Sequence, residues 1–285
     1  MLKEYEKNPS AYPLGYGEKD GLQYSLKETD LLEDMLETGF QQTHNIAING
    51  GSKNISYRMS AGMVDQDGIL VTNKDGYKRY NISSYIRSDA SKWFTPELDI
   101  KYGEADSRMP YTSANYGIWG AAVAFPSYFP LDDMEIGDEV LPVNSPRNFI
   151  QLAAPKTNKK TNLRIFGKVT ITSFKDLKII GEYTYNRQTT QGVTFDKKFD
   201  YAHGLNFRKE QSVANSKYSV SNGDTDYTAF NVYGNYNKKI GKHDIAVMAG
   251  LNQESKASKS VSAQRMDMIN EDLPLVKSRN IGFWF

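Results

Sequence analysis

The chain has 285 residues, with 35 Lys and Arg against 34 Asp and Glu, and it contains no cysteine. A net charge of +1 gives no bulk attraction to nucleic acid, and the lack of cysteine excludes a disulfide framework, a zinc ribbon and a thiol nucleophile. The mean hydropathy is −0.60, and no apolar run approaches the roughly 18 residues of a spanning helix. Aromatic residues make up 12% of the chain, a fraction that suits either a soluble all-β domain or a membrane β-barrel. In a membrane β-barrel, apolar and polar residues alternate, so their hydropathies cancel in any average.

The two ends of the chain differ from ordinary termini. Residues 1–37 are polar and acidic, and they predict an irregular lead-in with one short helical patch at 30–37. No apolar stretch of signal-peptide length follows Met1, and the chain stops on the apolar residues 281–285. Because natural termini are usually polar and exposed, we expect both ends to be cuts through something larger.

Eight segments alternate apolar and polar residues, a pattern that predicts β-strands. They occupy residues 40–50, 55–63, 79–87, 94–102, 162–171, 177–186, 230–237 and 245–253. Each is about ten residues long, which crosses a bilayer as a tilted strand, whereas soluble strands are nearer five or six. The polar positions include Arg58, Glu97 and Lys168, which require a water-filled or protein-filled interior.

The connections between these segments alternate between short and long. The short ones are 50–54, 90–93, 173–176 and 239–243, and the long ones are 65–76, 105–160, 188–225 and the stretch after Glu254. A soluble sandwich would produce a few such pairs, but loops beyond thirty residues are hard to place in a compact domain. The pattern favours an all-β fold, an antiparallel up-and-down transmembrane β-barrel segment with short periplasmic turns and long extracellular loops.

Short motifs in order along the chain add a resemblance. They are TGFQQTHN at 38–45, DQDGIL at 65–70, YKRYN at 77–81, SKWF at 91–94, GKHD at 241–244, AGL at 249–251 and NEDLP at 270–274. In this order and spacing the chain resembles the SusC/RagA-like TonB-dependent transporters of Bacteroidota outer membranes, from about residue 30 to 275.

The resemblance implies a barrel of about 22 strands around a plugged lumen, several times longer than this chain. It also implies import of glycan fragments or peptides through the outer membrane, energy from TonB, and a SusD-like surface lipoprotein as a lid. Neither catalysis nor a cofactor is implied. We therefore expect residues 1–37 to be the lead-in and 38–285 to be a partial barrel, with the plug domain, the TonB-contacting segment and the remaining strands absent.

The longest loop contains the candidate ligand contacts. Its aromatic residues are Tyr111, Tyr116, Trp119, Phe125, Tyr128 and Phe129. Aromatic faces bind sugar rings and peptides, although we favour the alternative that these rings fold the loop onto itself or onto a partner subunit. An acidic cluster in the same loop is a weak calcium candidate, and a solvated loop is the favoured interpretation. The cluster contains Asp132, Asp133, Glu135, Asp138 and Glu139.

Other residues suggest structural roles. His44, His203 and His243 have no spacing that would pair two of them as metal ligands. Trp93, Phe94 and Phe174 lie beside predicted short turns and suit a periplasmic aromatic girdle. Two further classes stay open, a passive porin or adhesin barrel and a soluble extracellular carbohydrate-binding β-domain. An enzyme is the class we favour least, because no phosphate cradle or nucleophile elbow is present.

Overall fold

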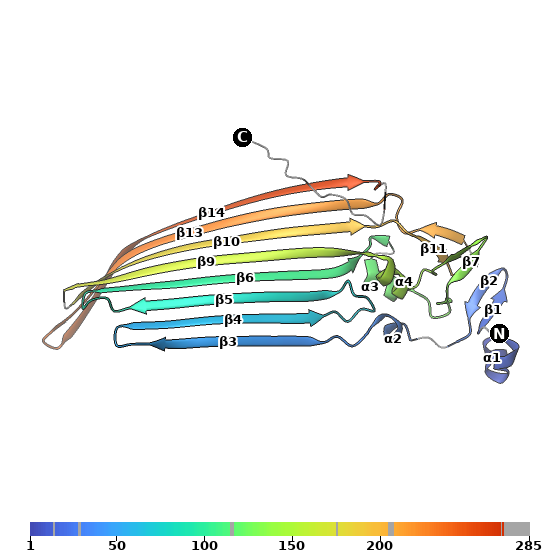
Figure 1. The fold of residues 1–285 in the computed structure, drawn as a ribbon, viewed down its shortest axis with the longest axis horizontal. Helices are drawn as coiled ribbons and strands as arrows, with labels where there is room; N and C mark the ends of the chain where they lie inside the picture. Colours follow the sequence, from blue (N-terminus) through green and yellow to red (C-terminus); the bar gives the residue numbers. More distant parts are fainter. Residues whose placement is uncertain are drawn as a thin grey trace.

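The computed structural model describes residues 1–13, 15–27, 30–114, 117–174, 176–204, 208–268 and 270, and one antiparallel sheet of eight strands dominates it. The strands are β3 (Gln41–Gly51), β4 (Ile55–Asp67), β5 (Gly76–Ser88), β6 (Phe94–Tyr111), β9 (Ala154–Phe174), β10 (Leu177–Asp196), β13 (Lys217–Ile240) and β14 (His243–Met266). All the helices and short hairpins gather at one end of this sheet (Figure 1).

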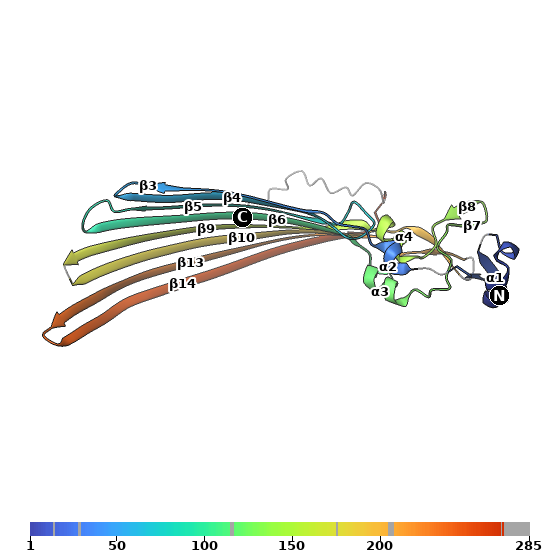
Figure 2. The same ribbon diagram turned by 90° about the horizontal axis from the view of Figure 1, so that it is seen from below.

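The eight strands form a meander in which each pairs with the one before it in the sheet. The sheet is twisted and open (Figure 2). Over the described part of the chain, β3 and β14 are its two edges and do not pair with each other. The predicted antiparallel up-and-down arrangement, with four short turns at one end and long connections at the other, is therefore confirmed. Over the described residues, the sheet does not close into a barrel.

The lengths of the later strands correct the expectation of about ten residues each. Strands β9, β10, β13 and β14 have 21, 20, 24 and 24 residues, about twice what a bilayer crossing needs. Consequently the long connections shrink to 112–153 and 197–216, and β14 runs on through the stretch after Glu254. The alternation of apolar and polar residues does not predict this extra strand length, because both faces of the sheet are polar there, as at Thr189 and Thr190. The hydrogen-bonded ladder nevertheless continues through these residues.

One face of the sheet carries a belt of apolar side chains. The register aligns Ile46 of β3 with Ala61 of β4, Ala61 with Ile82 of β5, and Ile82 with Tyr102 of β6. The belt continues to β14, where Leu251 is 81% exposed. Since large apolar side chains this exposed are unfavourable in water, this face is suited to lipid.

The opposite face carries a row of charged side chains at the same height. Glu97 of β6 lies 3.5 Å from Arg87 of β5 and 3.4 Å from Lys168 of β9, and it accepts a hydrogen bond from the Tyr85 hydroxyl at 3.0 Å. On β10, Glu182 accepts a hydrogen bond from the Tyr233 hydroxyl at 3.2 Å. The two faces thus differ in polarity, as the alternating sequence pattern predicts.

The segment before the sheet is more ordered than the sequence suggested. It contains α1 (Leu2–Lys7), the 3-10 helix η1 (Pro9–Ala11), a hairpin of β1 (Tyr16–Lys19) and β2 (Leu22–Ser25), and α2 (Leu31–Met35). Helix α2 is the expected helical patch, and it begins at Asp30, whose carboxylate accepts from the backbone N–H groups of Leu32 and Glu33. No described helix is long and apolar enough to cross a membrane.

The buried apolar clusters lie at the long-loop end of the sheet. One joins Met35 and Leu70 to Ile118 and Ile150 of the connection 112–153. A second is centred on Phe149, and a third is centred on Val143. At the other end, Trp93 and Phe174 are exposed beside the short turns, where Trp93 packs against Phe94. Their place agrees with an aromatic girdle, which stays a prediction.

Candidate functional site

The two long connections fold into one unit, which we call the cap and define as residues 112–153 and 197–216. The first contains α3 (Gly117–Ala124), the hairpin of β7 (Met134–Ile136) and β8 (Glu139–Leu141), and α4 (Pro146–Leu152). The second contains the hairpin of β11 (Asp200–His203) and β12 (Arg208–Gln211). Helix α4 begins where the Ser145 hydroxyl accepts from the Asn148 N–H at 3.2 Å and Pro146 supplies the first helical φ angle.

Backbone hydrogen bonds join the two connections. Val143 and Ala202 form a parallel bridge, in which the Ala202 N–H donates to the Pro142 carbonyl at 2.8 Å and the Asn144 N–H donates to the Ala202 carbonyl at 3.0 Å. The Asn144 side chain also accepts from the Gly204 N–H at 3.1 Å. The second connection is therefore held by the first, although Asn144 and Gly204 are 60 positions apart in the sequence.

Side chains tie the cap to the rest of the molecule. Buried Asp196, at the end of β10, accepts hydrogen bonds from the backbone and hydroxyl of Ser113. Lys74 donates to the Ala153 carbonyl at 2.7 Å, just after α4, where helix carbonyls lack partners. Arg147 of α4 pairs with Asp34 of α2 at 2.9 Å. The cap therefore has a defined position at the rim of the sheet.

The outer hairpins of the cap are linked by charge. Lys209 of β12 pairs with Asp200 of β11 at 3.1 Å and with Glu139 of β8 at 2.5 Å. Beside this pair, the Tyr201 hydroxyl donates to Glu210 at 2.8 Å, and burial and this hydrogen bond raise the pKa of Tyr201 to about 12. These exposed pairs orient the hairpins and add little stability by themselves.

Two of the six candidate aromatic residues are buried inside the cap. Phe125 and Phe129 lie edge-on at 5.2 Å, and Phe129 also meets the ring of His203 at 5.8 Å. These two side chains fold the cap and are not available to a ligand in this arrangement.

Three candidates keep exposed surface, and Tyr116 lies outside the described residues. Trp119 of α3 is 50% exposed and Tyr128 is 47% exposed. Tyr128 packs against Tyr24 of β2 at 6.0 Å, and Tyr111, at the end of β6, lies 5.6 Å from the Lys156 ammonium. Trp119 and Tyr128 are thus the members of the set that present ring surface to solvent.

The five acidic candidates do not converge. All are exposed, and none of the described residues forms a group of three or more His, Cys, Asp or Glu that could hold a metal ion. Asp132 accepts from the Tyr16 hydroxyl, and Glu139 pairs with Lys209. This arrangement agrees with the favoured interpretation of a solvated acidic loop.

Sequence reasoning missed residues that the topology brings to the cap. Lys74, Phe195 and Tyr218 line a cavity of about 370 Å³ between the cap and the upper end of the sheet. Lys74 belongs to the β4–β5 connection, at the long-loop end of the sheet, and Phe195 and Tyr218 pair across β10 and β13. Only the strand register could have brought them together, because the pattern did not predict strands in this part of the chain.

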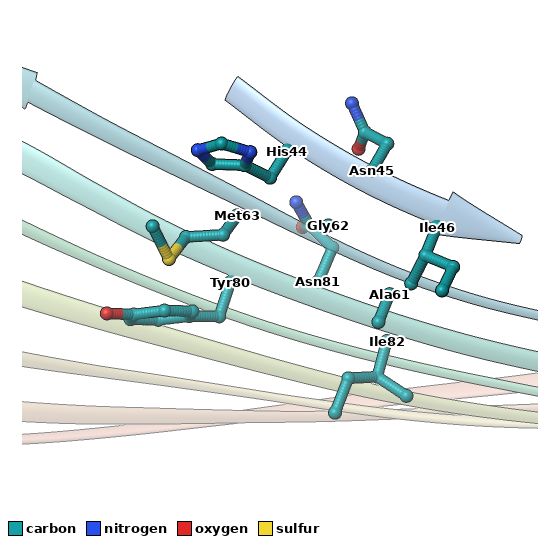
Figure 3. Close-up of a pocket in the computed structure, with 9 residues that line it drawn as sticks. All are labelled: His44, Asn45, Ile46, Ala61, Gly62, Met63, Tyr80, Asn81 and Ile82. Atoms are coloured by element: carbon teal, nitrogen blue, oxygen red, sulfur yellow. The ribbon is translucent and has the colours of Figure 1, made fainter. Parts of the chain in front are cut away.

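A second hollow lies on the apolar face of β3, β4 and β5 (Figure 3). Ile46, Ala61 and Ile82 lie in one row across the three strands, and His44, Met63 and Tyr80 lie in the next. Because it belongs to the apolar belt, we assign this hollow to lipid contact and not to a ligand.

Comparison with known proteins gives this geometry a context. No family model matches the chain. The TonB-dependent receptor SusC of Bacteroides thetaiotaomicron is 25% identical to it over 267 residues, which cover 82% of this chain and 25% of the receptor. The chain is SusC-like. It spans about a quarter of the length of that relative.

Solved structures support the same assignment at the level of fold. The RagAB peptide importer in its 'closed-closed' state matches the SusC-like chain with a TM-score of 0.67 and 18% identity, over 90% of this chain and 29% of the other. The structure of the RagAB peptide transporter matches with a TM-score of 0.69 and 16% identity, over 99% and 31%. The predicted partial-barrel fold is confirmed, and so is the outer-membrane location, which SusC and RagA share.

Proposed function

We propose that this SusC-like chain is the part of a TonB-dependent outer-membrane importer that supplies barrel wall and an extracellular cap. The observation that supports this most is the two-faced sheet with a folded cap at its long-loop end. An apolar face meets lipid, a charged face lines the lumen, and the cap stands where a solute enters. Transport requires no covalent bond to be made or broken, so we assign no catalytic residue.

The relatives and the resemblance in sequence support a proposal for the cargo and the partners. SusC is a TonB-dependent receptor, and RagAB is described as a peptide importer. We propose that the complete protein imports peptides or glycan fragments, draws energy from TonB through a part outside this chain, and works with a SusD-like surface lipoprotein. The region 38–285 would be partial barrel in that protein, and 1–37 would lie at its extracellular end.

Trp119 and Tyr128 are the proposed contacts to cargo or lipoprotein. Aromatic rings that are half exposed on a rigid support are common anchors of interfaces and sugar sites. Both lie on the first connection of the cap, whose other aromatic residues hold it in shape. Tyr111 is a weaker candidate, since Lys156 already covers one face of its ring.

The test uses the full-length protein that contains this segment. The double variant Trp119→Ala, Tyr128→Ala should reduce binding of cargo or of the surface lipoprotein by roughly tenfold or more, as hot-spot rings do. Val123→Ala is the matched control, because Val123 lies one turn from Trp119 on α3 and is 91% exposed. Unchanged binding of both cargo and lipoprotein would remove these two residues from the proposal. Uptake that persists without TonB would favour the passive porin.

A further inference from the structure

The two faces of the sheet differ in charge in the half of the strands nearer the cap. Along β9, Lys160 and Arg164 share the alternation of Lys168, which lies on the lumen face. Along β6, Lys101 shares the alternation of Glu97 on that face. Residues that pair with one another across the strands form a row. From the row of Arg164 to the row of Lys160, the cations of the lumen face, which we call the cationic band, are Arg79, Lys101, Lys160, Arg164 and Lys256.

Carboxylates accompany the cations on the outer face but not in the band. On the outer face, Lys78 pairs with Asp65 at 2.8 Å, and Lys159 pairs with Glu104 at 2.7 Å. Among the described residues in the rows of the cationic band, none carries a carboxylate on the lumen face. The members of the band that are exposed and form no ion pair within the described part of the chain are Arg79, Lys160 and Lys256.

The band also places two like charges directly opposite each other. Lys101 of β6 pairs in the register with Arg164 of β9, and like charges at such positions destabilise a sheet. Lys101 reaches Asp99, one row farther from the cap, at 3.6 Å. The Arg164 guanidinium lies 5.7 Å from the centroid of the Phe166 ring, which orients it without neutralising it. An anion in the lumen would relieve the repulsion, and a wall with one sign of charge attracts such anions.

The row between the cations is rich in amide and hydroxyl groups. Its polar side chains, one strand after another, are Asn45, Asn81, Asn162, Gln188, Thr225 and Ser258. Amides and hydroxyls both donate and accept hydrogen bonds, as the hydroxyl groups of a sugar do. The largest aliphatic side chain in these rows is Val64, so the described lumen face here offers little surface to the apolar side chains of a peptide.

We propose that the cargo is a glycan fragment that carries carboxylate groups, and that the cationic band binds it in the lumen below the cap. The inference rests on the import function proposed above and narrows its cargo to an acidic saccharide. Arg164 supplies a planar fork for a carboxylate, and the lysines add point charges. Lys160 and Arg164 are four residues apart, about 13 Å along β9, so a chain of several sugar units is needed to reach both.

The binding test uses the full-length protein in detergent, with tetragalacturonic acid as the probe and its neutral methyl ester as the counterpart. The acid should bind at least roughly tenfold more tightly than the ester, because the ester loses the charge-assisted contacts. The double variant Lys160→Gln, Lys256→Gln should weaken binding of the acid by roughly tenfold and leave that of the ester unchanged. The matched control is Lys159→Gln, Lys259→Gln, which removes lysines from the same two strands on the outer face and should bind like the wild type.

Each other outcome contradicts the proposal. Failure of the acid to bind, equal affinity for acid and ester, or equal weakening by the two double variants overturns it. Tetraglutamic acid that binds as tightly as tetragalacturonic acid would show that charge alone is read and would overturn the saccharide assignment. A lower melting temperature of the lumen-face variant with unchanged binding would assign the cations to a contact within the complete protein.

Failure of this inference is distinguishable from failure of the import function. TonB-dependent uptake of peptides or neutral glycan by a protein that does not bind the acid would refute the acidic cargo and leave the import function standing. Uptake that persists without TonB would refute the import function itself.

Discussion

Single residues with no exposed surface hold the cap together. Phe149 of α4 is 0% exposed and meets Phe199 and Tyr201 edge-on, with 5.4 and 5.2 Å between ring centroids. Its two partners come from the second connection, so this one ring joins both halves of the cap. Removal of a ring at such a position loses burial and leaves a cavity.

Phe149→Ala should therefore lower the free energy of opening of the cap by about 3–5 kcal/mol. Hydrogen-exchange protection of the α4 amides in the full-length protein measures this quantity. Val123→Ala, at an exposed position of α3, should stay within about 0.5 kcal/mol. Equal protection in the two variants would show that Phe149 does not hold the cap.

Asp200 makes the cap sensitive to acid. Partial burial acts to raise its pKa, but hydrogen bonds from Lys209 and Gln211 outweigh this and lower the pKa overall. A lowered pKa stabilises the fold above the unfolded value of about 3.9, and this stabilisation disappears as the pH falls through the folded value. Protection factors of the β11–β12 amides should fall as the pH drops below about 4, and Asp200→Asn should flatten that dependence. An identical pH profile in the variant would contradict the assignment.

At the scale of elements, each strand has two faces that tolerate different substitutions. Ile179 lies on the apolar face of β10, and the next residue, Ile180, lies on the charged face beside Tyr233. Ile179→Lys should destabilise the barrel by about 2 kcal/mol, because the ammonium would enter lipid, and Ile180→Lys should change little. Urea or guanidinium unfolding in vesicles measures the free energy of unfolding of both variants. A larger loss of that free energy in Ile180→Lys than in Ile179→Lys would reverse the assignment of faces.

The same two faces explain how much the sequence predicted. The sequence predicts the eight segments of about ten residues because one face of each strand is apolar there, and the resemblance orders them. It does not predict the halves of β9, β10, β13 and β14 nearer the cap, because both faces of the strands are polar there. On β9, for example, the neighbours Asn158 and Lys159 place a polar side chain on each face. For Phe125 and Phe129 the sequence leaves two roles, ligand contact and the favoured packing of the loop, and their burial agrees with packing. The partner of Phe129 could not be predicted, because His203 comes from another connection that the sequence alone does not bring near.

At the scale of the whole molecule, the account depends on one orientation, with the apolar belt in lipid, the charged row in the lumen and the cap outside the cell. The open edges at β3 and β14 and the coverage of about a quarter of SusC agree with a wall segment of a larger barrel. Because the chain has no cysteine, a single cysteine introduced on β10 is the only thiol that this segment offers to a probe.

The most direct measurement is therefore a scan of single cysteines along β10, from Lys178 to Gln191, each labelled with an environment-sensitive fluorophore in the full-length protein in vesicles. A lipid-soluble quencher should act at the odd-numbered positions Ile179, Gly181, Tyr183 and Tyr185 and fail at the even-numbered positions between them, and the alternation should end at Arg187. Equal access of a water-soluble quencher to every position would contradict the membrane-spanning sheet.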